Sequence, residues 1–240
     1  MEIILILLAV TVASGIGTLT GFGLSTILVP VLALFYPLPE TLLFVGIIHW
    51  FNDIWKLVLF RQGLRWKLIL SFGVPGIAAT ILGASLVFDF SSSLLSHILG
   101  AFLLVYVVLL FLKKAIQVNP SAGAGVVGGA LSGFLAGIFG MGGTVRSMFL
   151  LAFNLPKAVY LSTTGAIALV IDSGRLATYV AKGLKVDPPL AWSMLLFVPA
   201  SFISAQLAKS VVSRTPQGRF RKVVGVFLLL VALKLLIWPK

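Results

Sequence analysis

Two glycine-rich stretches decide the fold of this chain: Gly15-Ile16-Gly17-Thr18-Leu19-Thr20-Gly21-Phe22-Gly23, and Gly133 to Gly137 followed by Gly140-Met141-Gly142-Gly143. They interrupt two long apolar runs, which cover residues 2–36 and 122–154. A membrane-spanning helix needs about 20 residues, so each run is too long for one helix. We expect each run to form a helical hairpin with two short arms that reverses at its glycines.

Composition indicates that the rest of the chain also lies in a bilayer. Hydrophobic residues make up 60% of the 240 and charged residues 10%, whereas soluble domains contain about 25% charged residues. The net charge of +12 does not indicate nucleic-acid binding, because the Lys and Arg residues lie in short loops between apolar runs. Without cysteine, the chain has no disulfide framework or Cys-based metal site. We expect a multi-pass membrane protein whose partners are lipid and a small solute, with no cofactor or metal.

The remaining apolar runs each have the length of one spanning helix: 41–60, 68–88, 93–112, 158–181, 189–209 and 222–238. At an offset of 120, residues of the first half fall on counterparts in the second: Gly17 on Gly137, Gly23 on Gly143, Asn52 on Asp172 and Gly63 on Gly183. The sequence therefore predicts an all-α polytopic membrane domain of two repeats, 1–118 and 119–240. Each repeat is a glycine-broken hairpin plus three transmembrane helices. A chance match of glycines in apolar sequence is the alternative.

The charges of the loops predict how the hairpins are oriented. If both hairpins return to the side on which they enter, one side of the membrane collects eleven basic residues: Arg61, Arg65, Lys67, Lys113, Lys114, Lys157, Lys209, Arg214, Arg219, Arg221 and Lys222. The other side then has Lys182, Lys185 and Lys240. Cytoplasmic loops are rich in Lys and Arg, so this arrangement is favoured over one in which each long run crosses once. It places both termini outside the cytoplasm and inverts the two repeats, a plan typical of transporters.

Several motifs follow one another in an order that is informative: Gly17 to Gly23 with Pro30 after it, Pro39 opening the next helix, the loop Arg61-Gln62-Gly63, and the second-half copies Gly137 to Gly143 and Lys182-Gly183. In these motifs the chain resembles the sulfite exporter TauE/SafE family, also called the 4-toluene sulfonate uptake permeases, over nearly its whole length. The resemblance implies an exporter or permease of the bacterial inner membrane for sulfite, an organosulfonate or a related small sulfur oxyanion. It also implies transport driven by an ion gradient, which agrees with the absence of a Walker-type motif.

The hairpin tips are the predicted substrate site. A helix that starts at Gly23 or Gly143 presents unpaired N–H groups and the positive end of its dipole, which together bind an oxyanion. Glycine also lets the backbone approach a ligand closely. The predicted substrate-binding residues of the tips are Thr20, Gly21, Gly23 and Ser25 in the first half and Gly140, Gly142, Gly143 and Thr144 in the second. The alternative is that these small residues only let helices pack closely.

Two arginines inside the apolar runs complete the predicted substrate site. Arg146 lies three residues beyond Gly143, and Arg175 lies in the run 158–181. An arginine at the centre of a bilayer costs about 2.5–3.5 kcal/mol, and its planar fork fits two oxygens of a sulfite or sulfonate. For Arg146 the alternative is an ion pair with a neighbouring helix. For Arg175 it is neutralisation by Asp172, three residues away on the same helix face.

A second polar group is predicted to couple transport to protons: His49, Asn52, Asp53 and Asp172. His49 and Asp53 are four residues apart and can touch, and histidine changes charge near neutral pH. A purely structural contact between them is the alternative. Lys56, one turn from a basic loop, is expected to snorkel to the membrane surface. If Lys56 stays inside the membrane instead, three cations face two carboxylates there. The surplus positive charge then favours an anionic substrate.

These features together predict a secondary transporter with alternating access at a site between the hairpin tips. An anion channel of the same fold and a non-catalytic membrane subunit of a larger complex are the rival functions. The sequence leaves open whether the chain forms a homodimer. An enzyme is not expected, because no His-x-x-Glu-His or Gly-x-Ser-x-Gly motif occurs and the chain has only two histidines.

Overall fold

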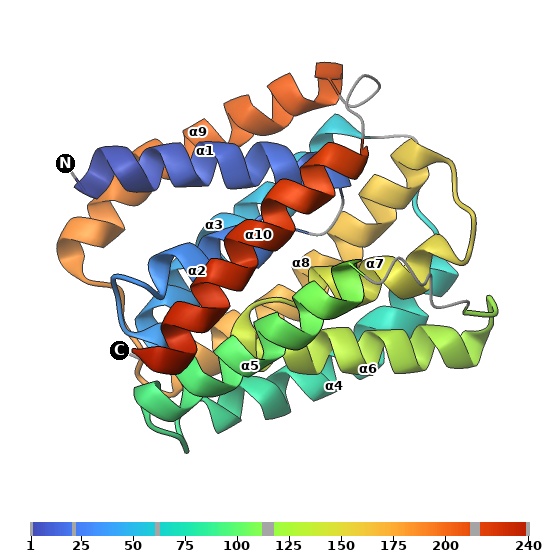
Figure 1. Cartoon of the computed structure of the whole chain (residues 1–240). Coiled ribbons are helices and arrows are strands. Elements are labelled where there is room, and N and C mark those ends of the chain that lie inside the picture. Colours follow the sequence, from blue (N-terminus) through green and yellow to red (C-terminus); the bar gives the residue numbers. More distant parts are fainter. Residues whose placement is uncertain (1, 21–22, 61–62, 112–117, 212–216, 239–240) are drawn as a thin grey trace.

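The chain folds into a bundle of helices (Figure 1). The computed structural model describes residues 2–20, 23–60, 63–111, 118–211 and 217–238. These residues form ten helices and no strand: α1 (Glu2–Thr20), α2 (Ser25–Leu32), α3 (Leu38–Leu59), α4 (Trp66–Leu86), α5 (Ser92–Phe111), α6 (Ala122–Phe139), α7 (Gly143–Leu151), α8 (Lys157–Ala181), α9 (Pro188–Val211) and α10 (Gln217–Ile237). The predicted all-α class is therefore confirmed for the described part of the chain.

In both long apolar runs the chain reverses direction at the glycine break. Ile6 of α1 and Leu32 of α2 line one apolar pocket, so α2 runs back along α1. A Cβ atom on Gly128 of α6 would lie 2.6 Å from the ring of Phe149, so α7 runs back along α6. The arms are unequal, with 19 and 8 residues in the first hairpin and 18 and 9 in the second. The expectation of two short arms is therefore wrong, because the entering helix continues almost to the break.

The helices also continue through some of the glycines that were predicted to break them: Gly15, Gly17, Gly133 and Gly137. A Cβ on Gly133 would lie 2.2 Å from the carbonyl oxygen of Gly76, and one on Gly137 would lie 2.3 Å from that of Thr80. The backbones of α6 and α4 are thus in direct contact. For these two glycines the alternative of close helix packing is correct, and the second break is confined to residues 140–142, between α6 and α7.

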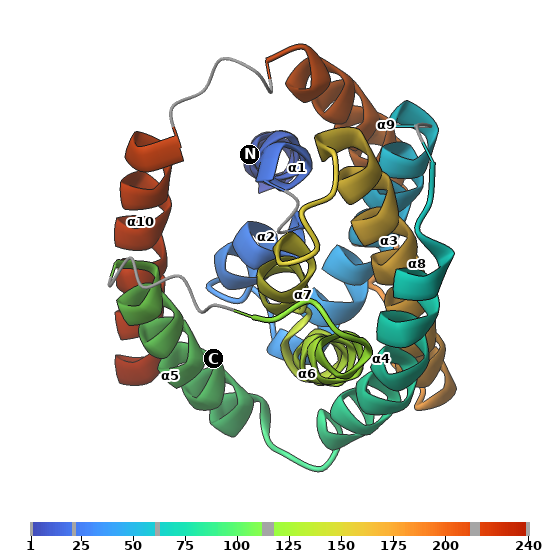
Figure 2. The same ribbon diagram turned by 90° about the vertical axis from the view of Figure 1, so that its right-hand side faces the viewer.

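The two hairpins enter the bundle from opposite ends. Figure 1 shows α1 running inward from the left and α6 running inward from the right, while both termini lie at the left. Their short arms, α2 and α7, contact each other. Seen from the right-hand side, α5 and α10 form one side of the bundle, α3, α4, α8 and α9 form the opposite side, and the hairpins lie between them (Figure 2).

Helices α3 and α8 cross as an antiparallel pair. A Cβ on Gly46 of α3 would lie 2.9 Å from Leu176 near the end of α8, and one on Gly165 of α8 would lie 3.2 Å from Lys56 near the end of α3. The indole N–H of Trp50 also donates to the hydroxyl of Ser173 across the pair, at 2.9 Å. These contacts hold the middle of α3 against the middle of α8.

The distribution of apolar residues is that of a chain surrounded by lipid. In the described chain, four helical segments are long and apolar enough to cross a membrane: α3, α4, α6 and residues 190–210 of α9. α8 is not among them, because it carries Asp172, Arg175 and several hydroxyl residues. Large apolar side chains such as Leu70 and Trp192 are exposed on the outside, while Asp172 and Arg175 of α8 are buried. Polar groups of membrane proteins face the bundle interior in this way.

Candidate substrate site

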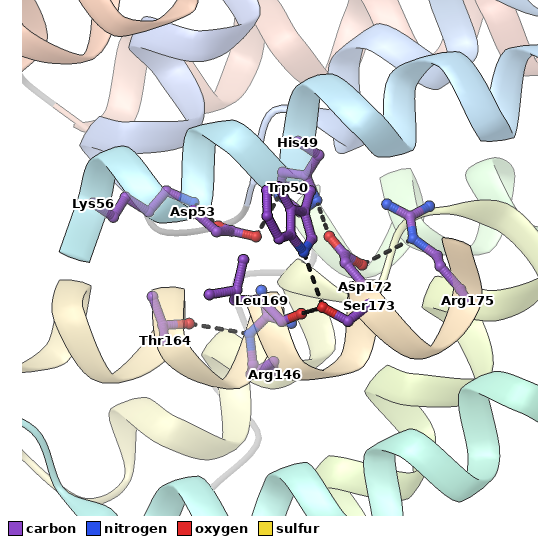
Figure 3. Close-up of polar contacts among 10 residues, drawn as sticks. All are labelled: His49, Trp50, Asp53, Lys56, Arg146, Thr164, Leu169, Asp172, Ser173 and Arg175. Atoms are coloured by element: carbon purple, nitrogen blue, oxygen red, sulfur yellow. Dashed lines mark hydrogen bonds and ion pairs between the residues drawn. The ribbon is translucent and has the colours of Figure 1, made fainter. Parts of the chain in front are cut away.

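The buried charges of the described chain are gathered in one place. Its buried acidic, basic and imidazole side chains are His49, Asp53 and Lys56 of α3, Arg146 of α7, and Asp172 and Arg175 of α8. Figure 3 shows these six side chains together between α3 and α8. Ionisable groups inside a membrane are rare, and they mark substrate or ion pathways. We call these six residues the charged cluster.

Four close contacts connect five members of the charged cluster in a row. Lys56 Nζ lies 2.7 Å from Asp53 Oδ1, and His49 Nε2 lies 3.8 Å from Asp53 Oδ2. His49 Nδ1 lies 2.7 Å from Asp172 Oδ2, and Arg175 Nε lies 2.8 Å from Asp172 Oδ1. His49 is thus placed between two carboxylates, and each carboxylate has a cation on its far side. The predicted contact with Asp53 is the longer of the two, and the shorter one to Asp172 was not predicted.

Lys56 does not snorkel, contrary to expectation. Its side chain is fully buried and its ammonium group bonds to Asp53, one turn earlier on α3. The nearby carboxylate therefore holds the ammonium group inside the bundle instead of letting it reach the membrane surface. As a result the charged cluster contains three cations and two carboxylates, and it carries one surplus positive charge while His49 is neutral.

Only one nitrogen of the Arg175 guanidinium group bonds to a carboxylate. Its Nε bonds to Asp172, while Nη1 and Nη2 are buried and have no hydrogen-bond partner among the described residues. A Cβ on Gly140 would lie only 2.8 Å from Nη1, so the guanidinium group lies directly against the second break. Gly140 has φ of 68°, a left-handed conformation that glycine adopts without strain. Neutralisation by Asp172 is therefore observed, and it leaves Nη1 and Nη2 without a carboxylate partner, with the hydroxyl of Tyr179 beside the guanidinium group.

Arg146 lies on the first turn of α7. Its Nε donates to the hydroxyl of Thr164 at 3.1 Å, and its Nη2 is buried without a partner in the described part of the chain. No carboxylate among the described residues lies within ion-pair distance of Arg146. The alternative of a structural ion pair is therefore not observed, although Asp172 is near enough for the two charges to interact.

The first break places backbone beside the imidazole of His49. Gly23 has φ of 89°, and a Cβ there would lie 2.6 Å from His49 Nε2. α2 then begins at Ser25, whose hydroxyl is buried with no partner in the described structure, and no side chain caps the helix start. Of the other predicted residues of this tip, Gly21 and the side chain of Thr20 lie outside the described residues.

The second break is equally enclosed. Gly140, Gly142 and Gly143 are buried, Thr144 is half-buried, and no side chain caps the start of α7. A Cβ on Gly142 would lie 2.1 Å from the carbonyl oxygen of Ser132, so the reversal of the chain leaves no room for a side chain. The first N–H groups of a helix have no partner within the helix. Both short arms therefore present backbone donors toward the interior of the bundle.

The charged cluster links the two breaks. His49 lies against Gly23, Arg175 lies against Gly140, and Asp172 contacts both side chains. Gly140 is also beside Val29 of α2. The structure thus brings together residues of both predicted tips with the predicted coupling residues, which the sequence had treated as separate groups.

Two polar side chains add to this region. Asn52, a predicted coupling residue, is fully buried on α3, and neither atom of its amide has a partner among the described residues. Tyr179 was not predicted as a site residue from the sequence. Its hydroxyl lies near the guanidinium of Arg175 and donates to the carbonyl of Gly137. The signal for Tyr179 was its position four residues after Arg175, which places both side chains on one helix face.

Three side chains of the charged cluster have the spacing of metal ligands. His49, Asp53 and Asp172 offer ligand atoms that lie within 4.8 Å of one another. Lys56 and Arg175 already neutralise the two carboxylates, and they would repel a metal cation. The electrostatics of the cluster therefore favour an anion or a proton as the visiting species.

Comparison with known proteins agrees with this arrangement. The family model described as sulfite exporter TauE/SafE matches residues 6–235. The chain belongs to the sulfite exporter TauE/SafE family. The resemblance inferred from the glycine breaks is thus confirmed, and the chain is a multi-pass membrane protein of a transporter family and not of an enzyme family. A search of curated proteins found no relative that matches the chain.

Proposed function

We propose that this TauE/SafE member is a secondary transporter that carries a small sulfur oxyanion, such as sulfite or an organosulfonate, across the bacterial inner membrane. Two inverted repeats, 1–118 and 119–240, rock about the site between the two breaks, so that the site faces each side of the membrane in turn. The single observation that carries the proposal is the set of three buried, unpartnered guanidinium nitrogens of Arg146 and Arg175 at the second break.

Helix packing supports the inverted repeats. If the first five helices correspond to the last five, then α1 corresponds to α6 and α4 to α9. Contacts follow this correspondence: α4 packs on α6 as α1 packs on α9, and α4 packs on α8 as α9 packs on α3. The pairs α2–α7, α3–α8 and α5–α10, in which each helix meets its own counterpart, are also in contact. A chance match of glycines in the sequence does not explain this packing.

Local backbone features recur at the same spacing. Gly63 follows α3 with φ of 109°, and Gly183 follows α8 with φ of 87°. Pro37 at the start of α3 and Pro156 at the start of α8 have nearly the same backbone angles, with φ of −54° and −52° and ψ of 141° in both. Pro37 is therefore the counterpart of Pro156, and Pro39, which was predicted to open this helix, is its second residue.

The ends of the helices support the proposed orientation. In Figure 1 the ends of α3 and α9 and the beginnings of α4, α8 and α10 lie at the right, opposite both termini. The basic residues of the described chain that adjoin these ends include Arg65, Lys67, Lys157 and Lys209. We assign this end to the cytoplasm because cytoplasmic loops are enriched in Lys and Arg. Both termini then lie outside the cytoplasm.

The proposed anion is held by donors of both kinds. Guanidinium nitrogens of Arg146 and Arg175 supply charge-assisted hydrogen bonds, and the N–H groups at the starts of α2 and α7 supply uncharged ones. The surplus positive charge of the cluster is neutralised when a monoanion enters. Removing a buried charge from the protein–ligand contact should therefore weaken binding strongly.

Proton coupling is proposed for His49 with the two carboxylates beside it. Imidazole is the side chain whose ordinary charge change falls near neutral pH, and its 2.7 Å contact with Asp172 leads on to the arginine at the anion site. Asn52 does not titrate, so within this proposal its buried amide orients water or substrate and carries no proton.

Transport by the purified chain in proteoliposomes tests the proposal. Sulfite flux is measured for the wild type, for Arg146→Gln, and for Lys185→Gln, which removes one exposed positive charge outside the charged cluster. We expect Arg146→Gln to weaken anion uptake about 100-fold and Lys185→Gln to leave it unchanged. Undiminished flux through Arg146→Gln would remove Arg146 from the site.

The same vesicles separate the rival functions. A secondary transporter moves sulfite uphill when a proton gradient is imposed, whereas an anion channel only lets it equilibrate. A non-catalytic subunit gives no flux alone and regains it only with a co-purified partner. Sulfite accumulation against its gradient is the outcome that supports the proposal.

A further inference from the structure

The net charge of the charged cluster depends on the protonation of His49. Lys56, Arg146 and Arg175 oppose Asp53 and Asp172, and these residues are all buried. The cluster therefore carries one positive charge when His49 is neutral and two when it is protonated. Uncompensated charge inside a membrane protein is expensive, so the charge of a bound anion and the protonation of His49 have to be linked.

Two carboxylates adjoin the imidazole of His49. Nδ1 is 2.7 Å from Asp172 and Nε2 is 3.8 Å from Asp53. A proton added to this ring creates a buried positive charge, and that charge has a carboxylate on each side as its partner. Lys56 and Arg175 on the far sides of the two acids oppose that proton, as does Arg146 of α7. An anion with a second negative charge offsets this opposition.

Two tyrosines of α8 are the other titratable side chains beside the charged cluster: Tyr179 lies near the guanidinium of Arg175, and Tyr160 interacts with Arg146. The remaining described titratable side chains on helices packed against α3 are not among the buried charges: Lys157 on α8, His97 and Tyr106 on α5, and Lys209 on α9. α2 contains none. Lys209 bonds to the carbonyl of Leu59 at an exposed position, and His97 bonds to the carbonyl of Ser93. His49 is therefore the one histidine of the chain that faces the charged cluster.

We infer that His49 matches the cluster to the charge of the anion: a monoanion binds with His49 neutral, and a dianion binds together with one proton on His49. This inference rests on the proposed anion site and adds the charge class of its substrates. In both cases the loaded cluster has no net charge. Each turnover then moves one net negative charge, whether the substrate is a monoanion or a dianion with its proton.

Counting the protons taken up on binding tests this directly. Methanesulfonate and sulfate are sulfur oxyanions with fixed charges of one and two, so their own protonation does not interfere. Calorimetric titration of the purified full chain in buffers of different ionisation heat gives the number of protons bound per anion. At about pH 8, the upper end of the range in which histidine titrates, we expect about one proton per sulfate and about none per methanesulfonate.

Affinity should follow the same linkage. Sulfate binding should weaken by up to about tenfold per pH unit as the pH rises, whereas methanesulfonate binding should change much less. In His49→Gln the proton count for sulfate falls to none, and sulfate affinity falls more than methanesulfonate affinity. His97→Gln, which alters the half-buried histidine outside the cluster, keeps the wild-type counts.

The possible results distinguish the anion site from the role of His49. Equal proton counts for the two anions in the wild type overturn the inference and leave the anion site standing, and this comparison needs no variant. A count near one for sulfate that survives in His49→Gln assigns the proton to a carboxylate and also overturns it. If neither anion binds at any pH, the proposed anion site fails together with the inference.

Discussion

The start of α2 and the start of α7 share a backbone plan but meet different side chains. Each helix begins without a side-chain cap, after a glycine in the left-handed region. Gly23 before α2 faces the imidazole of His49, whereas Gly140 before α7 faces the guanidinium of Arg175. One break thus adjoins an imidazole, and the other adjoins a guanidinium group, which keeps its positive charge.

This difference suggests that the two halves have different roles in transport. With an offset of 120, Thr26 stands where the second half has Arg146, and Trp55 stands where it has Arg175. Leu169 stands where the first half has its buried histidine. Each half has a short helix whose start lacks a side-chain cap. Among the described residues, only the second half adds buried guanidinium nitrogens without a hydrogen-bond partner, and only the first half adds a buried imidazole. In the proposed mechanism the second half holds the anion and the first half holds the proton.

The largest effect on stability is expected from removing Arg175, the cation paired with Asp172. Arg175→Ala leaves the buried carboxylate of Asp172 without its partner, and breaking a buried pair costs about 3–5 kcal/mol. Arg146→Ala leaves no carboxylate unpaired and loses one hydrogen bond to Thr164, so its cost should be about 1 kcal/mol. Thermal unfolding in detergent measures both. Equal losses would mean that Arg146 also has a structural role as an ion-pair partner.

Neutralising one buried ion pair at a time separates the roles proposed for the two halves. The double variant Arg175→Met with Asp172→Asn should weaken sulfite binding about 100-fold, because it removes the free guanidinium donors. The double variant Lys56→Met with Asp53→Asn should weaken it less than about fivefold, because the Lys56 ammonium is already bonded to Asp53. Both variants keep the net charge of the cluster. Similar losses of affinity, measured by calorimetry, would contradict the assignment of the anion to the second half.

Methyl groups at the two breaks should separate the two roles. A Cβ on Gly140 would displace the guanidinium of Arg175, and one on Gly23 would displace the imidazole of His49. Each alanine also costs about 1–3 kcal/mol of backbone strain at positive φ. We expect Gly140→Ala to lower sulfite affinity by about tenfold and Gly23→Ala to change mainly the pH dependence of uptake. Proteoliposome flux at several pH values measures both, and the reverse pattern would exchange the roles of the breaks.

The smallest effect is expected at the two loop glycines, where the halves are alike. Gly63 and Gly183 have positive φ and no atom within 4 Å of a Cβ placed on them. Alanine at either position should destabilise the chain by about 1 kcal/mol, from backbone conformation alone. Unfolding temperatures of the two variants should fall equally while anion binding stays unchanged. A large difference between them would weaken the proposed correspondence of the halves.

Much of the fold could be predicted from the sequence because lipid imposes simple rules. The glycine breaks, the all-α class and five of the six buried ionisable residues follow from apolar length and from the rarity of charge in such runs; Lys56 is the exception. The limits of the breaks could not be predicted. Whether Gly137 breaks α6 or packs against Thr80 depends on a neighbouring helix, and composition does not reveal the neighbour.

The connections within the site were harder to predict than its members. Spacing along one helix showed that Asp172 and Arg175 could pair, and they do. The shorter contact of His49 crosses from α3 to α8 and joins residues 123 positions apart, which helical periodicity cannot show. Burial of Lys56 was mispredicted because it too depends on the neighbouring helices. The contact with Asp53 outweighs the tendency to snorkel only when those neighbours exclude water from the pair.

The position of a bound anion tests whether Arg146 and Arg175 hold the substrate between the two breaks. Selenite, the selenium counterpart of sulfite, can be soaked into crystals of the full chain, and its anomalous scattering marks its position. We expect a selenium peak between the starts of α2 and α7, within hydrogen-bond distance of guanidinium nitrogens of Arg175 and Arg146. A peak elsewhere in the bundle, with both arginines bonded only to protein, would contradict it.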